Sequence, residues 1–400
     1  MRAIKVQAAA FAAAVTLVAV AGCSVTPTAQ PSSDSSEPIV FGYAIAETGG
    51  FAGFDAAVVN GARVAAADIN AAGGVLGRQI EIKTVDTKSE IDGAAPAAQQ
   101  LLDDGADFIG STADYDFGGP ALRTADAAGH VSIAMAGDTR LGYNGVGPLA
   151  FNSYSGSPGE GVVMAEFAHD QGYRNTFVLT DTINSYPQSV SDAFTGRWAE
   201  YTDTTIAGTD LFNNADTSIR TQIDAIKAAA PDSILVASFP SGGAAAIRQI
   251  RAAGIDAPIL GDIGFDGSYW IDASEGLSDV FVPVLATPES DSEPILAMLD
   301  AYEELTGEAS IAPSYTAMGY VQVQVIAAAI EAAGSTDGTA VAAALAALDG
   351  FESVIGPIDY AWKSECNVPA TLPWTIVQVQ DGVQSVVEVR STEEVVEIEC

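Results

Sequence analysis

The chain has 400 residues, and its 16 Lys and Arg residues against 52 Asp and Glu residues give a formal net charge of −36 at pH 7. This charge excludes a nucleic-acid-binding role, because phosphate recognition requires clustered basic side chains. The length exceeds what a single hydrophobic core usually supports, so the sequence predicts two lobes.

The N-terminus predicts export. Arg2 and Lys5 precede an apolar run from Ala8 to Val20, which is too short to span a bilayer comfortably. The run leads into Ala21-Gly22-Cys23, which with Val20 resembles a bacterial lipobox, the motif whose cysteine is lipidated and becomes the mature N-terminus. We therefore predict a signal peptide over residues 1–22 and lipidation of Cys23. An ordinary secretory signal is the alternative.

A polar stretch rich in Pro, Ser and Thr runs from Ser24 to Pro38 and has no apolar periodicity. Such a composition is typical of a flexible linker, so residues 23–38 are expected to form a lipidated tether. Several acyl chains on Cys23 would anchor the protein stably to the cell membrane, on its extracytoplasmic side.

Strands and helices alternate from Ile39 onward, which predicts parallel sheets covered by helices on both faces. Val58, Ala62, Ala65 and Ile69 form one apolar helix face. In the first half the expected strands are Ile39–Ala46, Gln79–Val85, Phe108–Gly110 and Val131–Ala134. In the second half the expected elements are helices Gly159–Asp170, Ser189–Tyr201, Ser218–Ala229 and Gly242–Ala253, and strands Thr176–Asp181, Thr205–Gly208, Ser233–Ser238 and Pro258–Gly261. Strand Val280–Leu285 and helices Pro294–Leu305 and Tyr315–Ala333 follow.

The sequence contains no recognisable catalytic or metal-binding constellation. Its two histidines, His130 and His169, lack partners at metal-ligand spacing, and there is no phosphate-binding loop or nucleophile elbow. We therefore expect neither an enzyme nor a bound metal or cofactor. If Cys23 is lipidated, Cys366 and Cys400 remain as a candidate disulfide that would stabilise the fold by ~3–4 kcal/mol, with two free thiols as the alternative.

Two sequence stretches carry a family resemblance. The first is Ala-Asp-Ile-Asn-Ala-Ala-Gly-Gly-Val-Leu-Gly-Arg-Gln-Ile, residues 67–80. The second is Ile-Arg-Gln-Ile-Arg-Ala-Ala-Gly, residues 247–254, followed by Leu260-Gly261. Both resemble the solute receptors of ABC importers of the branched-chain amino acid (Leu/Ile/Val) type, and the resemblance extends over about Ile39 to Gln380.

The resemblance implies an α/β fold in which two Rossmann-like lobes with parallel sheets are joined by three crossovers and close around a ligand. Residues 39–152 and 286–350 would form lobe 1, and residues 153–285 and 351–400 would form lobe 2. The segment Ile355–Tyr360 would be the third crossover. Ligand contacts in such receptors come from loops at the carboxyl ends of the strands.

Carried onto this chain, the resemblance places the ligand against loop residues of both lobes. The implied ligand-binding residues are Phe51, Ser111, Thr112, Tyr115, Asp116, Ala136, Asp138, Thr139, Tyr186, Phe239 and Asp262, with Phe54 as a further apolar wall. Asp262 would receive a ligand ammonium group. Each has a structural alternative: Tyr186 and Asp262 could cap turns, Phe239 could belong to the core, and Ser111 and Thr112 could cap the next helix.

The loop after the third strand departs from the family pattern. Amino-acid receptors of this type tend to carry Ser and Thr there, whereas this chain has Asp114 and Asp116, with Asp138 in the adjacent loop. Acidic side chains near a ligand carboxylate would repel it unless they point to solvent. Either the acids face water and the ligand is an amino acid, or the ligand is an amide, a cation or another small polar molecule.

The resulting hypothesis is a monomeric, lipid-anchored, non-enzymatic receptor that captures a small molecule and delivers it to an ABC permease. An amino acid of the branched-chain type is the first expectation for the ligand, and an amide, urea-like or cationic compound is the alternative. A sensing lipoprotein that reports to a signalling partner would share the same fold. An exported hydrolase is a third hypothesis, against which stands the missing nucleophile–base pair.

Overall fold

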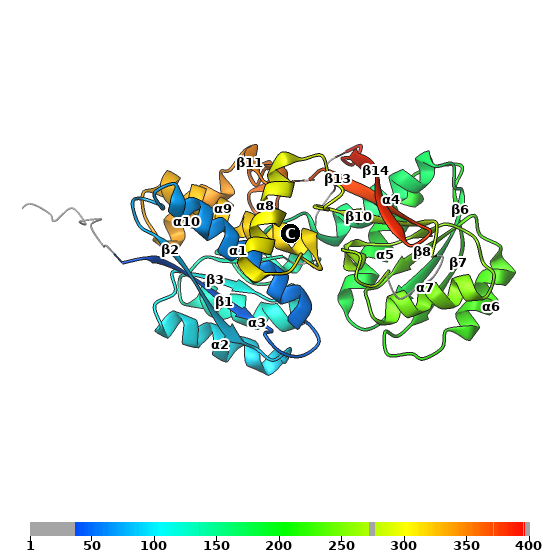
Figure 1. The fold of residues 1–400 in the computed structure, drawn as a ribbon, viewed down its shortest axis with the longest axis horizontal. Coiled ribbons are helices and arrows are strands. Elements are labelled where there is room, and N and C mark those ends of the chain that lie inside the picture. The colour runs from blue at the N-terminus through cyan, green and yellow to red at the C-terminus, as the bar shows by residue number, and fades with distance from the viewer. Residues whose placement is uncertain (1–36, 136, 272–276, 371, 395, 397–400) are drawn as a thin grey trace, which may run out of the picture. The chain divides into compact units, whose positions relative to one another are not determined.

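The structure, a computed structural model, describes residues 37–135, 137–271, 277–370, 372–394 and 396 (Figure 1). The predicted signal peptide, Cys23, most of the tether, Ala136 and Cys400 lie outside the described residues. Lipidation of Cys23 and the pairing of Cys366 with Cys400 therefore stay predictions. Cys366 itself is buried and packs beside Val368 and Trp362.

The first sheet is entirely parallel, with the strand order β2-β1-β3-β4-β5. Its strands are β1 (Ile39–Ile45), β2 (Ile80–Asp86), β3 (Phe108–Ser111), β4 (Ser132–Ala134) and β5 (Ala150–Asn152). The helices on this side are α1 (Ala52–Ala71), α2 (Ile91–Asp103), α3 (Tyr115–Ala127), α8 (Glu293–Thr306), α9 (Pro313–Ala333) and α10 (Gly338–Ala346).

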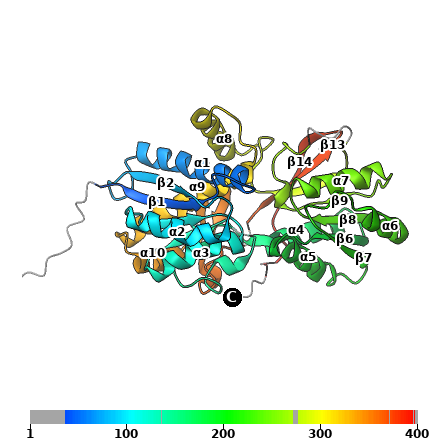
Figure 2. The same cartoon turned by 90° about the horizontal axis from the view of Figure 1, so that it is seen from below.

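Helices cover both faces of this sheet, as the strand–helix alternation predicts. Phe41 and Tyr43 of β1 belong to the apolar cluster that includes residues of α1 and α9, whereas Val40 and Ala44 belong to the cluster that includes α2 and α3. Figure 2 shows α1 and α9 on one side of β1 and β2, with α2 and α3 on the other. Alternate side chains of a strand point to opposite faces, so β1 is buried on both.

Two glycines let α1 and α9 approach closely. A Cβ atom on Gly61 would lie 2.0 Å from the carbonyl oxygen of Thr316, and a Cβ atom on Gly319 would lie 1.8 Å from that of Val58. Both distances are far below van der Waals contact, so only glycine fits at either crossing point. The predicted apolar face of α1 is buried here, with Val58, Ala62 and Ala65 all in the core.

The second sheet has the order β14-β13-β10-β9-β8-β6-β7. Its strands are β6 (Asn175–Asp181), β7 (Thr205–Phe212), β8 (Ser233–Ala237), β9 (Ile259–Leu260), β10 (Val280–Val284), β13 (Trp374–Gln380) and β14 (Val383–Arg390). Its helices are α4 (Gly156–Asp170), α5 (Ser185–Trp198), α6 (Arg220–Ala229) and α7 (Gly242–Ala252). Figure 2 shows α4 and α5 on one side of this sheet and α7 on the other.

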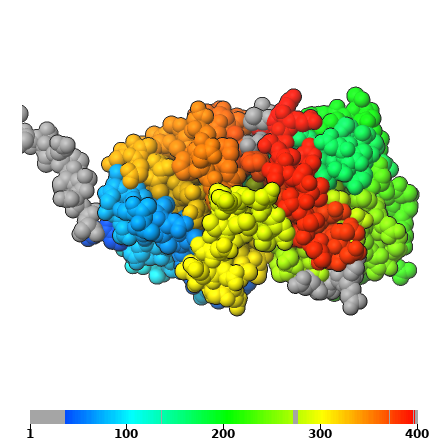
Figure 3. Space-filling view, turned by 45° about the horizontal axis from the view of Figure 1, so that its top comes forward, coloured from blue at the N-terminus to red at the C-terminus, as the bar shows by residue number. Residues whose placement is uncertain are grey.

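The strands from β10 to β7 run parallel, as predicted, but β13 and β14 are antiparallel and were not predicted. The hairpin lies at the molecular surface (red in Figure 3). Val383 and Val389 of β14 are 67% and 65% exposed, so this edge strand buries little apolar area. It contributes no continuous apolar run of the kind that marks a central parallel strand.

The third connection between the sheets lies later than the predicted segment Ile355–Tyr360. The Tyr360 hydroxyl donates a 2.6 Å hydrogen bond to the Asn152 carbonyl of β5, and the Asn367 carbonyl accepts a 2.9 Å bond from the Asn152 N–H. Tyr360 and Asn367 are thus hydrogen-bonded to β5 of the first sheet. The small hairpin of β11 (Phe351–Ser353) and β12 (Gly356–Ile358) precedes them in the chain, and the turn η3 (Ala361–Lys363) lies between them. The chain joins the second sheet only at β13.

Among the described helices, none alone is long and apolar enough to cross a membrane. Among these helices, α9 and α10 are long and apolar enough only when taken together, and they are bent by 108° at the break between them. Most of α9 is buried in the protein core.

Candidate functional site

A pocket lies where the carboxyl ends of strands from both sheets come together, the position at which open α/β sheets bind ligands. Loops and helix starts after β1, β3, β4 and β5 line it from the first sheet, and those after β6, β8 and β9 line it from the second. The lining residues are Phe51, Phe54, Asp55, Ala113, Asp114, Tyr115, Met135, Gly137, Asp138, Tyr154, Asn184, Ser185, Tyr186, Phe239, Gly264 and Tyr315.

Asp55 is the most deeply buried acid of the lining. It lies in the first turn of α1 and is only 1% exposed. Its Oδ2 accepts hydrogen bonds from the Ala46 N–H (2.7 Å) and the Thr112 hydroxyl (2.7 Å). Its Oδ1 accepts none from any described residue. Burial raises the pKa of Asp55 to about 7, against the opposing effect of the two hydrogen bonds.

Asp114 caps the next helix that faces the pocket. Its Oδ1 accepts hydrogen bonds from the N–H groups of Asp116 and Phe117 at the start of α3. Its Oδ2 accepts a 2.8 Å bond from the side-chain amide of Asn184, which belongs to the second sheet's side of the pocket. Partial burial raises the pKa of Asp114 above its usual value. The Asp114 carboxylate thus occupies the N-terminus of α3, the positive end of the helix dipole, where an anionic ligand group would otherwise bind.

Asp138 is the one lining acid that pairs with a basic side chain of the described residues. It caps the short 3-10 turn η1 (Thr139–Leu141) and forms an ion pair with Arg140. The Arg140 guanidinium also lies over the ring of Tyr115, 4.2 Å from its centroid. Ser185 donates a 3.4 Å hydrogen bond to Asp138 across the pocket. The Asp138 charge is therefore largely neutralised.

Tyr186 forms the main wall from the second sheet's side. Asn184 caps α5 by accepting a hydrogen bond from the Tyr186 N–H (3.2 Å), which fixes the start of this helix. The ring packs against Gly137 so closely that a Cβ atom at that position would lie 2.2 Å from Tyr186 Cδ2. Glycine at residue 137 is therefore needed for this placement of the tyrosine ring.

Two acids lie behind Tyr186, outside the pocket lining, and both are fully buried. Glu160 of α4 accepts hydrogen bonds from the hydroxyls of Tyr186 (2.7 Å) and Tyr154 (3.0 Å), and Asp262 accepts them from the N–H groups of Ser238 and Gly264. Burial raises the pKa of both carboxyl groups, and the nearby Glu160 charge raises that of Asp262 further. These acids hold Tyr186 and its neighbours in place.

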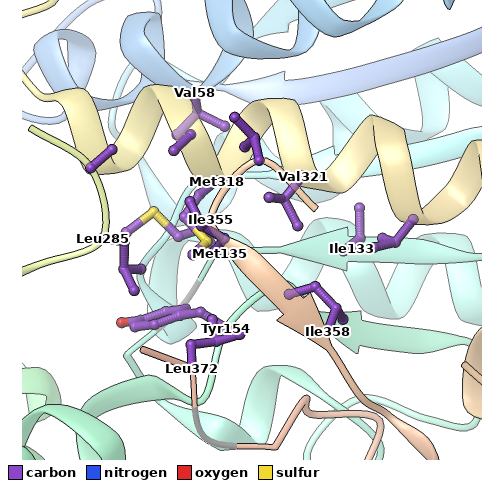
Figure 4. Packing of buried hydrophobic residues seen from close by; sticks show 14 of the residues in the cluster. Val58, Ile133, Met135, Tyr154, Leu285, Met318, Val321, Ile355, Ile358 and Leu372 are labelled. Carbon is purple, nitrogen blue, oxygen red and sulfur yellow. The ribbon is translucent and has the colours of Figure 1, made fainter. Parts of the chain in front are cut away.

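Aromatic rings form much of the remaining surface. Phe54 of α1 and Tyr315 of α9 pack with ring centroids 5.0 Å apart, and Phe51 packs against Phe117 at 4.8 Å. Figure 4 shows Tyr154 beside Leu285 and below Met135 and Met318, which places it on the apolar core of the first sheet's side. The pocket therefore combines apolar walls with a few acidic and amide groups, a composition typical of small-molecule sites.

The structure places the predicted site residues in three groups. Phe51, Phe54, Tyr115, Asp138, Tyr186 and Phe239 line the pocket. Ser111, Thr112, Asp116, Thr139 and Asp262 are not among its lining residues. Ala136 lies outside the described residues. The ligand-binding role of the first group stays a prediction.

Several of the predicted residues outside the lining make contacts within the protein. The Ser111 hydroxyl donates to the Thr112 carbonyl, and the Thr112 hydroxyl donates to Asp55, so both are used within the protein. Asp116 is exposed on the first turn of α3. The Asp262 carboxylate caps the turn η2 (Ile263–Phe265), the structural alternative for this residue, and its contact with a ligand ammonium group stays a prediction.

Several lining residues escaped the sequence analysis as ligand contacts, notably Asp55, Asp114, Asn184, Tyr154 and Tyr315. Asp55 lies one residue after Phe54, in the first turn of a predicted helix, where an acid usually serves the helix dipole alone. Asn184 stands just before a helix and is typical of an ordinary N-cap, whereas Asp114 was noted only as an acid that departs from the family pattern. Only their convergence from two sheets marks them as pocket residues.

Comparison with known proteins agrees with this geometry. The family described as periplasmic binding protein matches residues 38–384. The chain belongs to the periplasmic binding protein family. Its relatives are substrate-binding proteins of ABC transporters, not enzymes.

This periplasmic binding protein is 26% identical over 339 residues to the Leu/Ile/Val-binding protein homolog 3 of Brucella melitensis, covering 83% of this chain and 89% of the relative. Its fold matches the crystal structure of LivJ from Streptococcus pneumoniae in complex with isoleucine, with a TM-score of 0.74, 23% identity and coverage of 88% and 99%. It also matches a solute-binding protein from R. palustris in complex with benzoate, with a TM-score of 0.75, 17% identity and coverage of 90% and 98%. The predicted α/β fold of type I is confirmed.

Within the described residues, no group of three or more His, Cys, Asp or Glu side chains is arranged to hold a metal ion. The acids of the pocket are separated by aromatic and small residues. Their arrangement suits hydrogen bonding to an organic ligand.

Proposed function

We propose that this protein is the extracytoplasmic receptor of an ABC importer, which captures a small molecule in the pocket between its two sheets. The observation that supports this most directly is the convergence of loops from both sheets on one aromatic-walled pocket. Membership in a family of ABC-transporter substrate-binding proteins supports the same conclusion.

Capture would proceed by hinge closure of the two lobes around the ligand. The side-chain bonds that now cross the pocket are polar: Asn184 to Asp114, Ser185 to Asp138, and Arg140 to Ser185. Such bonds between partly exposed groups contribute only about 1 kcal/mol each, so opening the pocket would cost little. The ligand itself would then supply most of the free energy that holds the lobes together.

The captured molecule would be delivered to a membrane permease powered by a separate ATPase. Lipidation of Cys23 would keep the receptor at the membrane surface, with residues 23–38 as the tether. The Cys23→Ser variant should then be released into the soluble fraction, while wild-type protein stays with the membrane. Equal membrane association of both proteins would contradict the anchor.

The capture function is tested by thermal unfolding of the mature protein with amino acids, amides, urea, amines and small aromatic acids. A ligand at 100–1,000 times its Kd should add ~2.7–4.1 kcal/mol to the free energy of unfolding. If no compound of such a panel moves the melting temperature, the capture function is contradicted.

A further inference from the structure

We infer that the ligand of this pocket is a small organic cation, an amine or guanidine that carries no carboxylate group. This inference rests on the proposed capture function and names the class of molecule captured. It departs from the amino-acid ligand that the family resemblance implies. Three features support it: the acids Asp55 and Asp114 line the pocket, the nearby hydroxyl donors are already bonded to the protein, and the walls are aromatic.

The first observation concerns Asp55 Oδ1, which has no hydrogen-bond partner among the described residues. This side chain is 99% buried, lines the pocket, and leaves Oδ1 without a hydrogen bond from any described residue. Among the described residues, no Lys, Arg or His forms an ion pair with it. A buried carboxylate with one free oxygen is completed by a donor from a ligand, and a cationic donor also offsets its charge.

The second observation is that the natural anion sites of the pocket are already filled. The N-terminus of α3 is capped by Asp114, and the first turn of α1 carries Asp55. The hydroxyls of Ser111 and Thr112 donate to protein acceptors. A ligand carboxylate entering here would meet two negative groups at the helix ends where it would otherwise bind favourably.

The third observation is the absence of basic side chains from the lining. None of the described residues that line the pocket is Lys, Arg or His. Arg140, whose guanidinium lies over the ring of the lining residue Tyr115, is paired with Asp138. Without an available cation in the wall, the charges of Asp55 and Asp114 are left for the ligand to balance.

Aromatic walls complete the recognition of a cation. Phe54 and Tyr315 pack together on one side, and Tyr186 and Phe239 lie on the other. Ring faces attract ammonium and guanidinium groups through their quadrupoles, and they also bury the hydrocarbon part of an amine. The Tyr315 hydroxyl forms no hydrogen bond with another described residue. Its oxygen can therefore accept a hydrogen bond from an ammonium or guanidinium group.

The test compares matched pairs of probes by calorimetry and thermal unfolding of the mature protein. The pairs are 3-methylbutylamine with leucine, agmatine with arginine, and choline with glycine betaine, each related by the presence of a carboxylate. Isovaleramide, urea and benzoate serve as neutral and anionic probes. We expect at least one of the three cations to bind at least tenfold more tightly than its carboxylate-bearing partner.

Two charge-removing variants assign the effect to the pocket. Asp114→Asn keeps a good helix cap while removing the charge, and should weaken cation binding at least tenfold. Asp55→Asn should do the same, and Asp114→Asn decides the question if Asp55→Asn fails to fold. The matched control is Asp92→Asn, an exposed acid in the first turn of α2 that does not line the pocket, which should leave affinity unchanged.

The possible results separate this inference from the proposed function. Tighter binding of leucine, arginine, isovaleramide or benzoate than of any cation would overturn the inference and leave capture intact. Equal loss of affinity in Asp114→Asn and Asp92→Asn would also overturn it. Binding of no probe at all would contradict the capture function, and this inference would fall with it.

Discussion

The two walls of the pocket use acidic residues in opposite ways. On the first sheet's side, Asp55, Asp114 and Asp138 line the pocket itself. On the second sheet's side, Glu160 and Asp262 are withdrawn behind the lining, where every hydrogen bond they accept comes from the protein. Acids of the first wall are therefore exposed to the pocket interior, whereas acids of the second wall position the residues that line it.

This difference shows that residue type alone does not define a binding contact. Burial of a carboxyl group raises its pKa on both walls, because a charge is disfavoured away from water. What distinguishes the walls is whether the carboxyl groups line the pocket, and on the first wall Asp55 also has an oxygen, Oδ1, that accepts no hydrogen bond from any described residue. Variants that remove acids from each wall should therefore affect different quantities, stability on one side and affinity on the other.

The largest effect is expected from the second wall. Glu160→Ala removes the acceptor of the Tyr154 and Tyr186 hydroxyls, and should lower the free energy of unfolding by about 3 kcal/mol. Urea denaturation without ligand measures this loss. Glu160→Gln keeps the side-chain shape and should cost clearly less. A Glu160→Ala variant as stable as wild type would show that this acid does not hold the wall.

Tyr186 should contribute to ligand affinity as well as to the structure of the wall, since it lines the pocket and also bonds to Glu160. Tyr186→Ala should weaken ligand binding at least tenfold, or about 1.4 kcal/mol, by removing an aromatic wall. Calorimetric titration measures the change, with Tyr143→Ala as control because Tyr143 is 46% exposed and lies outside the lining. Similar affinities in the two variants would remove Tyr186 from the site.

The Asp55 charge on the first wall should make both the stability of the protein and its affinity for a cation depend on pH. The pKa of Asp55 is raised to about 7, so the folded protein binds its proton more tightly than the unfolded chain does. Ionisation of Asp55 as pH rises toward 7 therefore destabilises the ligand-free protein. The same ionisation should strengthen cation binding by up to about tenfold between pH 6 and pH 8.

Asp55→Asn provides the comparison for this pH effect. The variant cannot ionise at that position, so both its stability and its cation affinity should vary less between pH 6 and pH 8 than in wild type. Parallel pH profiles for the two proteins would show that another group is responsible.

The smallest effect is expected from Asp138, whose charge is already balanced by Arg140. Asp138→Asn should change ligand affinity by less than about threefold, because a partly exposed ion pair contributes little. The same titration measures it. A loss above tenfold would place Asp138 with Asp55 and Asp114 among the acids that meet the ligand.

Much of the fold could be predicted from local pattern. Strands such as Ile39–Ile45 and helices such as α1 carry their periodicity in consecutive residues, and the structure confirms them. The β13–β14 hairpin was missed because its outer strand is half-exposed and its pairing is antiparallel. The third connection was placed too early because Tyr360 and Asn367 bond to β5, a contact that spans more than 200 residues.

The candidate site was predicted less completely than the fold. The aromatic residues Phe51, Tyr186 and Phe239 were found because they follow strands in a family-like pattern. Asp55 was not distinguished from an ordinary acid of a first helical turn, Asp114 was noted only as a departure from the family pattern, and the ligand role of Asp262 stays a prediction. A carboxylate looks the same in a sequence whether its oxygens are free or satisfied.

The order of strands and helices, the acidic balance and the absence of catalytic motifs were all determined by the sequence, because each depends on neighbouring residues or on composition. Only the tertiary structure decided which acids enter the pocket. That choice depends on contacts such as Asn184 to Asp114, which join residues 70 positions apart. Local periodicity carries no information about such contacts, since they exist only where two separately formed sheets meet.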